Sequence, residues 1–369
     1  MKLLFVIVDG GGNVPPQLGV ARALQARGVA IQVLGHSGIR DRVEAAGLPF
    51  ESFSRGADLD PTTRCSLIGS MALFIRVAAD PELGRAAVEA ARRHDVDAVV
   101  IDMLLVAGVP EVADAGIPTV VFVHCFYRAL QDLAASPAGW TLRLRGANPY
   151  TAERRKLLQI VSARADLDPV RGEPPVRHTG VVWQGAPSAG APAAVPRILV
   201  SLSTCAFAGQ RGMLQNILDA VAPLPVEVTV TVGPGIDADG LRVPENVSMH
   251  EWMDHDEVLA TSSLLVGHGG HSTAMRALSF GVPQVVMPAN PMIDQKGVGA
   301  ALEKAGAGIL LTKHARPKRI RAAIETVLGD AAYRTAAERL GADIRRRDGA
   351  EVAADAIVEY VNASQLVDS

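Results

Sequence analysis

The sequence predicts an α/β protein built from two doubly wound, Rossmann-like domains that face each other across a cleft. Strand and helix patterns alternate from the N-terminus onward, which is typical of parallel sheets wrapped by helices. The alternation stops in residues 184–196, where small residues and proline dominate as in a linker, and it restarts at Arg197. The length of 369 residues exceeds what one hydrophobic core usually supports, which also favours two domains.

The first domain is expected to comprise residues 1–183. An apolar run at residues 3–8 predicts a buried strand, which a glycine turn joins to a helix over residues 17–27; Pro16 stands where a helix start tolerates proline. The same alternation predicts strands at residues 30–34, 98–101 and 119–123, and helices at residues 67–79 and 82–93. The pattern loosens over residues 126–164, where we expect helices and loops.

The second domain is expected to comprise residues 197–350, followed by a terminal helical segment at residues 351–369. Its first strand is predicted at residues 197–201. Three further apolar runs, each bounded by glycine or proline, predict buried strands at residues 264–266, within 281–288 and at 309–311.

Composition excludes several classes of protein. Apolar residues make up 49% of the chain and charged residues 20%, as in a globular protein, and a net charge of −3 gives no electrostatic case for nucleic acid as a partner. Three scattered cysteines form neither a disulfide framework nor a zinc motif. No apolar stretch approaches the ~20 residues of a membrane span, and the N-terminal run lacks a cleavage pattern, so we expect a cytoplasmic protein.

The segment from Gly267 to Thr273 is suited to hold a diphosphate without a metal ion. It joins an apolar strand to a helix, and Gly269 and Gly270 let the backbone approach a ligand closely. The amides of Ser272 and Thr273 lie in the first helical turn, where free N–H groups and the helix dipole favour anions. His268 adds an imidazole donor. The alternative is an ordinary strand–helix turn capped by Ser272.

The residues that follow decide between these interpretations. His268-Gly269-Gly270, Thr273, Gly281-Val282-Pro283, Pro288 and Asp294-Gln295 occur in this order. In this order of motifs the chain resembles the family-1 glycosyltransferases, two-domain enzymes of GT-B fold that move sugars from nucleotide donors. The resemblance implies an inverting enzyme that needs no metal or cofactor and uses a dTDP- or UDP-sugar as co-substrate. It also implies a small, largely apolar natural-product acceptor, which we place over residues 65–80 and 126–150, and a terminal helix that packs back on the first domain.

The resemblance also assigns roles to the donor site. His268, Gly269, Gly270 and the amides of Ser272 and Thr273 would hold the diphosphate. Asp294 and Gln295 would bind sugar hydroxyls, and Ser203 would reach the same phosphates. Trp252 would lie near the nucleobase, the alternative being a core or hinge tryptophan. Ser203 and Ser272 each replace a family glycine, and the spacing from Pro288 to Asp294 is longer than in relatives, which leaves the sugar open.

The largest departure lies in the first domain, where Asn13 occupies the position of the family's catalytic histidine. An amide does not titrate, so Asn13 cannot act as a general base. Three explanations remain open. The acceptor needs little base help; the base is Asp9, Asp102 or His124, each at a strand end; or the protein binds donor without efficient catalysis. Of the bases we favour Asp102, with Asn13 orienting the acceptor, and Asp102 as a helix cap is the alternative.

Two other functions remain in competition with glycosyl transfer. One is a sugar-nucleotide epimerase or hydrolase of the same fold, although the turn from Gly10 to Asn13 offers no acidic or basic group for it. The other is an inactive homologue that binds nucleotide sugar and assists a partner. An oxidoreductase is remote, because Pro15 stands where the third glycine of a dinucleotide-binding turn belongs. Whether the protein forms a homodimer is left open.

Overall fold

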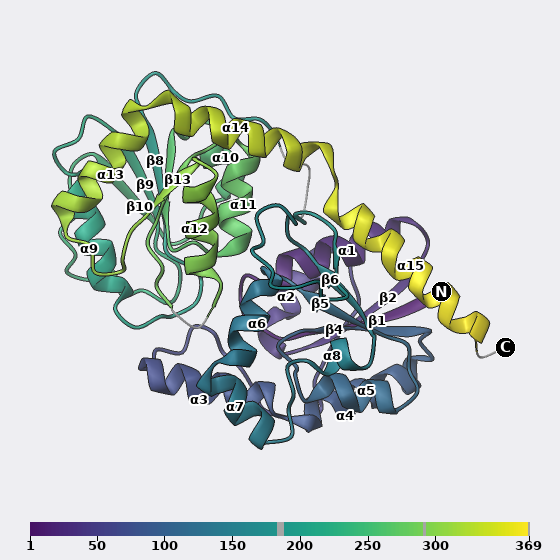
Figure 1. Ribbon diagram of the computed structural model, residues 1–369. Helices are drawn as coiled ribbons and strands as arrows, with labels where there is room; N and C mark the ends of the chain where they lie inside the picture. Colours follow the sequence, from purple (N-terminus) through teal and green to yellow (C-terminus); the bar gives the residue numbers. More distant parts are fainter. Residues whose placement is uncertain (183–187, 291–292, 368–369) are drawn as a thin grey trace. The chain divides into compact units, whose positions relative to one another are not determined.

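The computed structural model describes residues 1–182, 188–290 and 293–367 (Figure 1). The chain divides into two compact units. Unit 1 comprises Met1–Asp60, Ile68–Gly185 and Asp348–Ser369, and unit 2 comprises Pro61–Leu67 and Ala186–Arg347. Each unit is a parallel sheet with helices packed on it, so the prediction of two Rossmann-like α/β domains is confirmed.

Unit 1 contains a parallel sheet whose strands lie in the order β3-β2-β1-β4-β5-β6-β7. The strands are β1 (Lys2–Ile7), β2 (Ala30–Gly35), β3 (Phe50–Ser52), β4 (Ala98–Asp102), β5 (Thr119–Val123), β6 (Leu158–Val161) and β7 (Arg177–His178). Strands β4 and β5 are buried along their whole length, as expected for apolar strands covered on both faces. The carboxyl ends of β1, β4 and β5 are therefore neighbours.

The helices of unit 1 cover both faces of this sheet (Figure 1). They are α1 (Val14–Ala26), α2 (Arg40–Ala45), α3 (Leu67–Ala78), α4 (Pro81–His94), α5 (Gly108–Asp114), α6 (Tyr127–Ala135), α7 (Pro137–Leu144), α8 (Thr151–Arg154) and α15 (Gly349–Val367), with a short 3₁₀ helix at Ser37–Ile39. Helix α1 begins with Pro15 and Pro16 in its first turn, where their missing N–H groups cost nothing.

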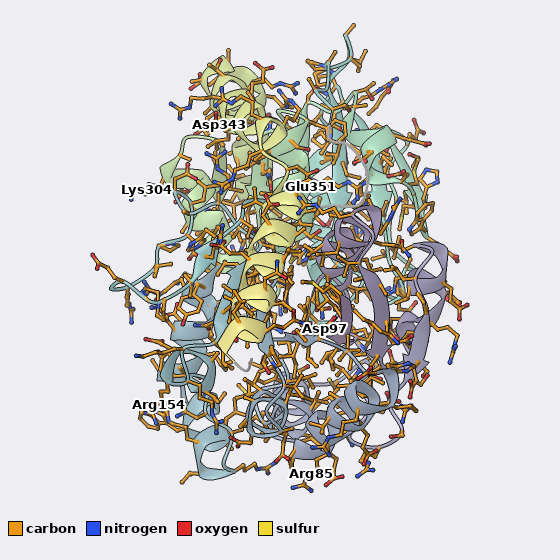
Figure 2. All side chains as sticks on the ribbon, turned by 90° about the vertical axis from the view of Figure 1, so that its right-hand side faces the viewer. Arg85, Asp97, Arg154, Lys304, Asp343 and Glu351 are labelled. Atoms are coloured by element: carbon orange, nitrogen blue, oxygen red, sulfur yellow. The ribbon has the colours of Figure 1, made fainter. Side chains whose placement is uncertain are left out.

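The terminal helix α15 packs on α1 within unit 1. Its apolar residues Ala353, Ile357 and Val361 join the same core as β1 and α1. Polar contacts hold both of its ends: Arg27 pairs with Glu351, and Gln365 Nε2 donates to Asp97 Oδ1 at 2.8 Å. Figure 2 shows α15 in yellow, with Glu351 near its beginning and Asp97 beside its later turns.

Unit 2 contains a second parallel sheet, in the order β10-β9-β8-β11-β12-β13. Its strands are β8 (Arg197–Ser201), β9 (Glu227–Thr231), β10 (Val247–His250), β11 (Leu264–Gly267), β12 (Gln284–Val286) and β13 (Gly308–Leu310). Its helices are α9 (Gln210–Val221), α10 (His255–Leu259), α11 (His271–Ser279), α12 (Gln295–Lys304), α13 (Pro317–Gly329) and α14 (Ala331–Arg346). Because β11 lies between β8 and β12, the segments that leave these three strands meet at one edge.

Two segments differ from the expected domain bounds. Pro61–Leu67 groups with unit 2 and not with the rest of residues 1–183, because Pro61 O accepts from Ala206 N at 2.9 Å and Arg64 lies 3.5 Å from Asp237. Of the expected linker 184–196, residues 184–187 lie outside the described residues. The described remainder is bonded to unit 2: Ala191 N donates to Ala260 O at 2.9 Å and Ala193 N to Thr261 O at 3.2 Å.

Candidate active site

The carboxyl edge of unit 1 gathers the three residues predicted to be catalytic. Asn13 follows β1 and opens α1, Asp102 ends β4, and His124 follows β5. The order β1-β4-β5 places Asp102 between the other two. The structure thus brings together residues that are far apart in sequence.

Asp102 is fully buried, and three neutral donors hold its carboxylate. Oδ2 accepts from Asn13 Nδ2 at 2.6 Å and from Gln17 Nε2 at 2.6 Å. Oδ1 accepts from the backbone N–H of Leu104 at 2.8 Å. The Leu104 bond resembles the capping contact expected as the alternative, yet Leu104 lies in a turn, and the next helix starts only at Gly108.

Asn13 has few free hydrogen-bonding groups. It is buried, and its Nδ2 donates to Val8 O at 2.7 Å as well as to Asp102. Its Oδ1 accepts from Gly10 N at 3.0 Å. Both amide protons are therefore committed inside the protein, and only a lone pair of Oδ1 is left for a ligand.

His124 faces Asp102 from the neighbouring strand. Its Nδ1 lies 3.6 Å from Asp102 Oδ1, just beyond a hydrogen bond, and 16% of its side chain is exposed. Within the described part of the chain Nδ1 is buried and has no hydrogen-bond partner. Burial lowers the pKa of His124 below its usual value, and the charge of Asp102 opposes that shift.

Asp9, the remaining candidate base, is engaged elsewhere. It is buried at the end of β1, and its Oδ1 lies 2.7 Å from the Arg42 guanidinium. The same oxygen accepts from Gly11 N at 3.3 Å. Both contacts hold the Asp9 carboxylate at the turn that follows β1.

In unit 2 the predicted diphosphate turn leaves β11 and enters α11. Gly269 has a φ of 80°, and a Cβ there would lie 2.6 Å from Val286 Cγ1. A Cβ on Gly270 would overlap Nε2 of His268. Both glycines are therefore required by close contacts. Gly270 is the N-cap and provides no side-chain cap, while Ser272 lies inside the first turn, so the interpretation of Ser272 as the cap is wrong.

His268 is buried beside this turn as a neutral imidazole. Its Nδ1 lies 3.4 Å from the carbonyl oxygen of Ser201, so Nδ1 carries the proton and Nε2 keeps its lone pair over Gly270. Burial lowers the pKa of His268 to about 4. To donate from Nε2, the ring must either bind a second proton or give up its Nδ1 proton and the bond to Ser201.

Ser203 keeps the backbone shape of the glycine that it replaces. Its φ is 101°, in the region that favours glycine. The Oγ atom accepts from Cys205 N at 3.0 Å, and a Cβ on Gly233 would lie 2.7 Å from Ser203 O. Close approach of this backbone is thus maintained despite the side chain.

Asp294 and Gln295 lie at the start of α12, next to the segment that leaves β12. Asp294 is the N-cap residue and is half-buried. Gln295 is fully buried, and its Oε1 accepts from Ala289 N at 2.7 Å and Asn290 N at 2.8 Å. Among the described residues its Nε2 has no hydrogen-bond partner, so one buried donor remains for a further group.

Trp252 is separate from this cluster. It follows β10, the strand at the far edge of the sheet, and 78% of it is exposed. The interpretation as a core tryptophan is therefore wrong. A solvent-exposed ring remains available to stack on a planar ligand.

The regions expected to receive the acceptor form a small apolar cluster in unit 1. Residues of α3 and α7 pack together around Ile75, Ala138 and Leu142. Ile68, Trp140 and Leu144 of the same helices are exposed. A separate cavity of about 550 Å³ near α6 and α8 is lined largely by charged and polar groups, among them Glu153, Arg154 and Arg171, and does not fit an apolar acceptor.

One residue at the catalytic edge was missed in the sequence. Gln17 lies one helical turn after Asn13, and a polar residue at that spacing, on a helix face that is otherwise apolar, was the available signal. Searched over the part of the chain that is described, the structure contains no group of three or more His, Cys, Asp or Glu that could hold a metal ion. Nor does any described helix combine the length and apolar character needed to cross a membrane.

Comparison with known proteins relates part of the chain to proteins of natural-product biosynthesis. Residues 215–359 match the C-terminal domain of the erythromycin biosynthesis protein CIII-like family. Demethyllactenocin mycarosyltransferase of Streptomyces fradiae is 33% identical over 164 residues, which cover 44% of this chain and 35% of that protein. The chain spans about a third of the length of the curated relatives that it matches.

Solved structures extend the likeness to almost the whole fold. CalG4, the calicheamicin glycosyltransferase, has a TM-score of 0.76 and 24% identity, and the match covers 98% of each chain. Spinosyn rhamnosyltransferase SpnG, solved with thymidine diphosphate, has a TM-score of 0.71 and 20% identity over 97% of this chain and all of that one. Its complex with the spinosyn aglycone has a TM-score of 0.69 and 21% identity, with the same coverage. These matches show the GT-B fold of bacterial natural-product glycosyltransferases, and they relate residues 215–359 to the C-terminal domain of one such biosynthetic family.

Proposed function

We propose that this protein is an inverting, metal-independent glycosyltransferase that moves a sugar from a dTDP- or UDP-linked donor to a small, largely apolar natural-product acceptor. The observation that carries the proposal is the diphosphate turn at the head of α11. Both of its glycines are required by contacts, and its first helical turn has no side-chain cap. Such a helix start favours an anionic ligand.

The donor diphosphate would be held by the first-turn amides of Ser272 and Thr273 and by His268. A diphosphate beside the imidazole favours its protonated form, so Nε2 would donate to a phosphate oxygen once it has taken up a proton. Ser203 would present its strained backbone to the same phosphates. These groups stabilise the charge that develops on the leaving diphosphate, which is the role a metal ion has in other transferases.

The sugar would contact Asp294 and Gln295. The support for Gln295 is its buried Nε2, which lacks a partner among the described residues and would gain one in a sugar hydroxyl. Trp252 would stack on the nucleobase through its exposed ring. The acceptor would bind near α3 and α7, whose exposed Ile68, Trp140 and Leu144 suit an apolar compound.

Acceptor deprotonation would occur at the edge where Asn13, Asp102 and His124 meet. An aliphatic hydroxyl is too weakly acidic to attack the anomeric carbon without a base. The second candidate function is a homologue that binds nucleotide sugar but transfers it poorly. Asn13 in the position of the family's catalytic histidine favours it.

A binding panel and a transfer assay together test the proposal. Thermal shifts with dTDP, UDP, ADP and GDP in EDTA should single out dTDP or UDP, because a ligand at 100 times its Kd adds about 2.7 kcal/mol of stability. Release of nucleotide from dTDP-glucose or UDP-glucose, with and without an acceptor, then separates an enzyme from a binding homologue. Absence of any nucleotide shift would contradict both functions.

A further inference from the structure

The carboxyl edge of unit 1 contains a histidine and a carboxylate on adjacent strands. We propose that His124 is the general base of the transfer reaction and that Asp102 positions it. Asn13 and Gln17 act on His124 indirectly, because their side-chain amides hold the Asp102 carboxylate in place. The inference rests on the glycosyl transfer proposed above and assigns the step that the asparagine at position 13 leaves without a base.

Asp102 itself is in the wrong place to meet an acceptor. Its side chain has no exposed surface, and its two oxygens already accept three hydrogen bonds. A general base must come within hydrogen-bond reach of the proton that it removes. The Asp102 carboxylate is therefore placed to act on the neighbouring His124 and not on the acceptor.

His124 has the geometry that Asp102 lacks. Its Nδ1 is buried and faces Asp102 Oδ1 at 3.6 Å, so the 16% of the side chain that is exposed belongs to its other atoms. A proton on Nδ1, directed at the carboxylate, leaves the lone pair of Nε2 for the acceptor. Burial lowers the pKa of His124, which favours the neutral imidazole that a general base must be, and the charge of Asp102 opposes that shift.

Asn13 and Gln17 explain why Asp102 turns toward β5. Both amides donate to Oδ2, at 2.6 Å each, and so leave Oδ1 on the side of His124. Gln17 Nε2 also donates to Asn13 O at 3.1 Å, which links the two amides across one turn of α1. Both groups are uncharged, so the charge of Asp102 is not neutralised and can stabilise the imidazolium. Among the described residues, Asp102 is the charged group that acts on His124.

The transfer step moves one proton, forms one bond and breaks another. His124 Nε2 takes the proton of the acceptor O–H while the oxygen lone pair forms a bond to the anomeric carbon. The bond from that carbon to the diphosphate oxygen breaks, and the nucleoside diphosphate leaves with the electron pair. His124 becomes an imidazolium that points Nδ1–H at Asp102, and it returns its proton to water after product release.

Two acceptors of different acidity distinguish the base from a structural residue. We compare benzyl alcohol, which needs a base, with 4-nitrophenol, which is ionised near neutral pH, using dTDP-glucose or UDP-glucose as donor. His124→Gln should lose about 10²–10⁴-fold in turnover with benzyl alcohol and retain most of its turnover with 4-nitrophenol. Gln17→Leu should give the same split with a smaller loss. His94→Gln, which changes another histidine of unit 1, should leave both rates unchanged.

A titration of the His124 ring by NMR tests the positioning role without any acceptor. Asp102→Asn should lower the His124 pKa by about one unit or more, because it removes the charge that favours the imidazolium. An unchanged His124 pKa in Asp102→Asn, or equal losses with both acceptors in His124→Gln, would overturn the assignment. If wild-type protein binds dTDP or UDP but transfers sugar to neither acceptor nor water, the base assignment fails and donor binding stands. If it binds no nucleotide, the proposed function itself fails.

Discussion

His268 is placed to bind a diphosphate, yet its imidazole is neutral. It is the histidine of the diphosphate turn, yet burial lowers its pKa to about 4 and keeps it neutral, although the hydrogen bond from Nδ1 to the carbonyl of Ser201 opposes that shift. A neutral ring with its proton on Nδ1 cannot donate from Nε2. Donation from Nε2 to a phosphate therefore needs either a second proton on the ring or loss of the Nδ1 bond to Ser201, and we expect the second proton because the Ser201 carbonyl favours a proton on Nδ1.

The coupling predicts proton uptake on nucleotide binding. Free His268 is unprotonated at pH 6–7, because its pKa of about 4 lies below that range. A bound diphosphate raises this pKa, so each nucleotide that binds takes up a fraction of a proton, and affinity falls as pH rises. Calorimetry of dTDP or UDP binding in buffers of different ionisation enthalpy measures the uptake. His268→Gln should abolish it; uptake that persists in His268→Gln would contradict the account.

The backbone conformation of Ser203 predicts which substitutions at this position stabilise the protein. At an ordinary position glycine is less stable than alanine by ~0.5–1 kcal/mol. At Ser203 the φ of 101° reverses the order, because left-handed backbone costs a side-chain-bearing residue roughly 1–2 kcal/mol. Denaturant unfolding should therefore find Ser203→Gly more stable than Ser203→Ala. Ser364 in α15 is the matched control, where the alanine variant should be the more stable; alanine ahead of glycine at position 203 would refute the argument.

Among the elements, α11 and the turn before it depend on two glycines for different reasons. Gly269 needs its positive φ and its contact with Val286, whereas Gly270 needs room for the His268 ring. The turn is therefore shaped by its neighbours as well as by its own sequence. This separates it from a generic strand–helix connection.

A matched pair of glycine variants tests this element. Gly270→Ala should displace His268, whose Nε2 a new Cβ would overlap, and weaken dTDP or UDP binding at least as strongly as His268→Ala. A Cβ at Gly212 in α9 has no heavy atom within 4 Å. Gly212→Ala should therefore stabilise the helix by ~0.5–1 kcal/mol and leave the affinity for dTDP or UDP unchanged. Thermal shift and calorimetry on the two variants decide. Normal affinity in Gly270→Ala would show that the contact has no role in binding.

Elements with long apolar runs could be predicted from the sequence, and short edge elements could not. Strands at residues 119–123 and 197–201 coincide with β5 and β8. The missed strands β3, β6, β7, β9 and β10 are two to five residues long, and most lie at or near sheet edges, where a period-two pattern has too few residues to be distinctive. The donor turn was predictable because its residues are contiguous.

Contacts between residues far apart in the sequence determine the features of the molecule that the sequence alone did not predict. Pro61–Leu67 packs with unit 2 through Ala206 and Asp237, partners more than a hundred residues away. Gln17 gains its role only because β4 brings Asp102 beside α1. Local sequence patterns do not predict such long-range contacts. Asn13, Asp102 and His124, by contrast, could be predicted to meet, since all follow strands of one parallel sheet.

We expect this chain to bind a nucleoside diphosphate through the α11 turn without a metal ion. Calorimetry in EDTA tests this expectation most directly. The wild-type protein should bind dTDP or UDP, and His268→Ala should bind it more weakly. Loss of one such charge-stabilising donor costs ~2.7–4 kcal/mol in the transition state of transfer, so turnover should fall further than affinity. Binding that requires Mg²⁺, binding of neither nucleotide, or equal affinity in His268→Ala would contradict the account.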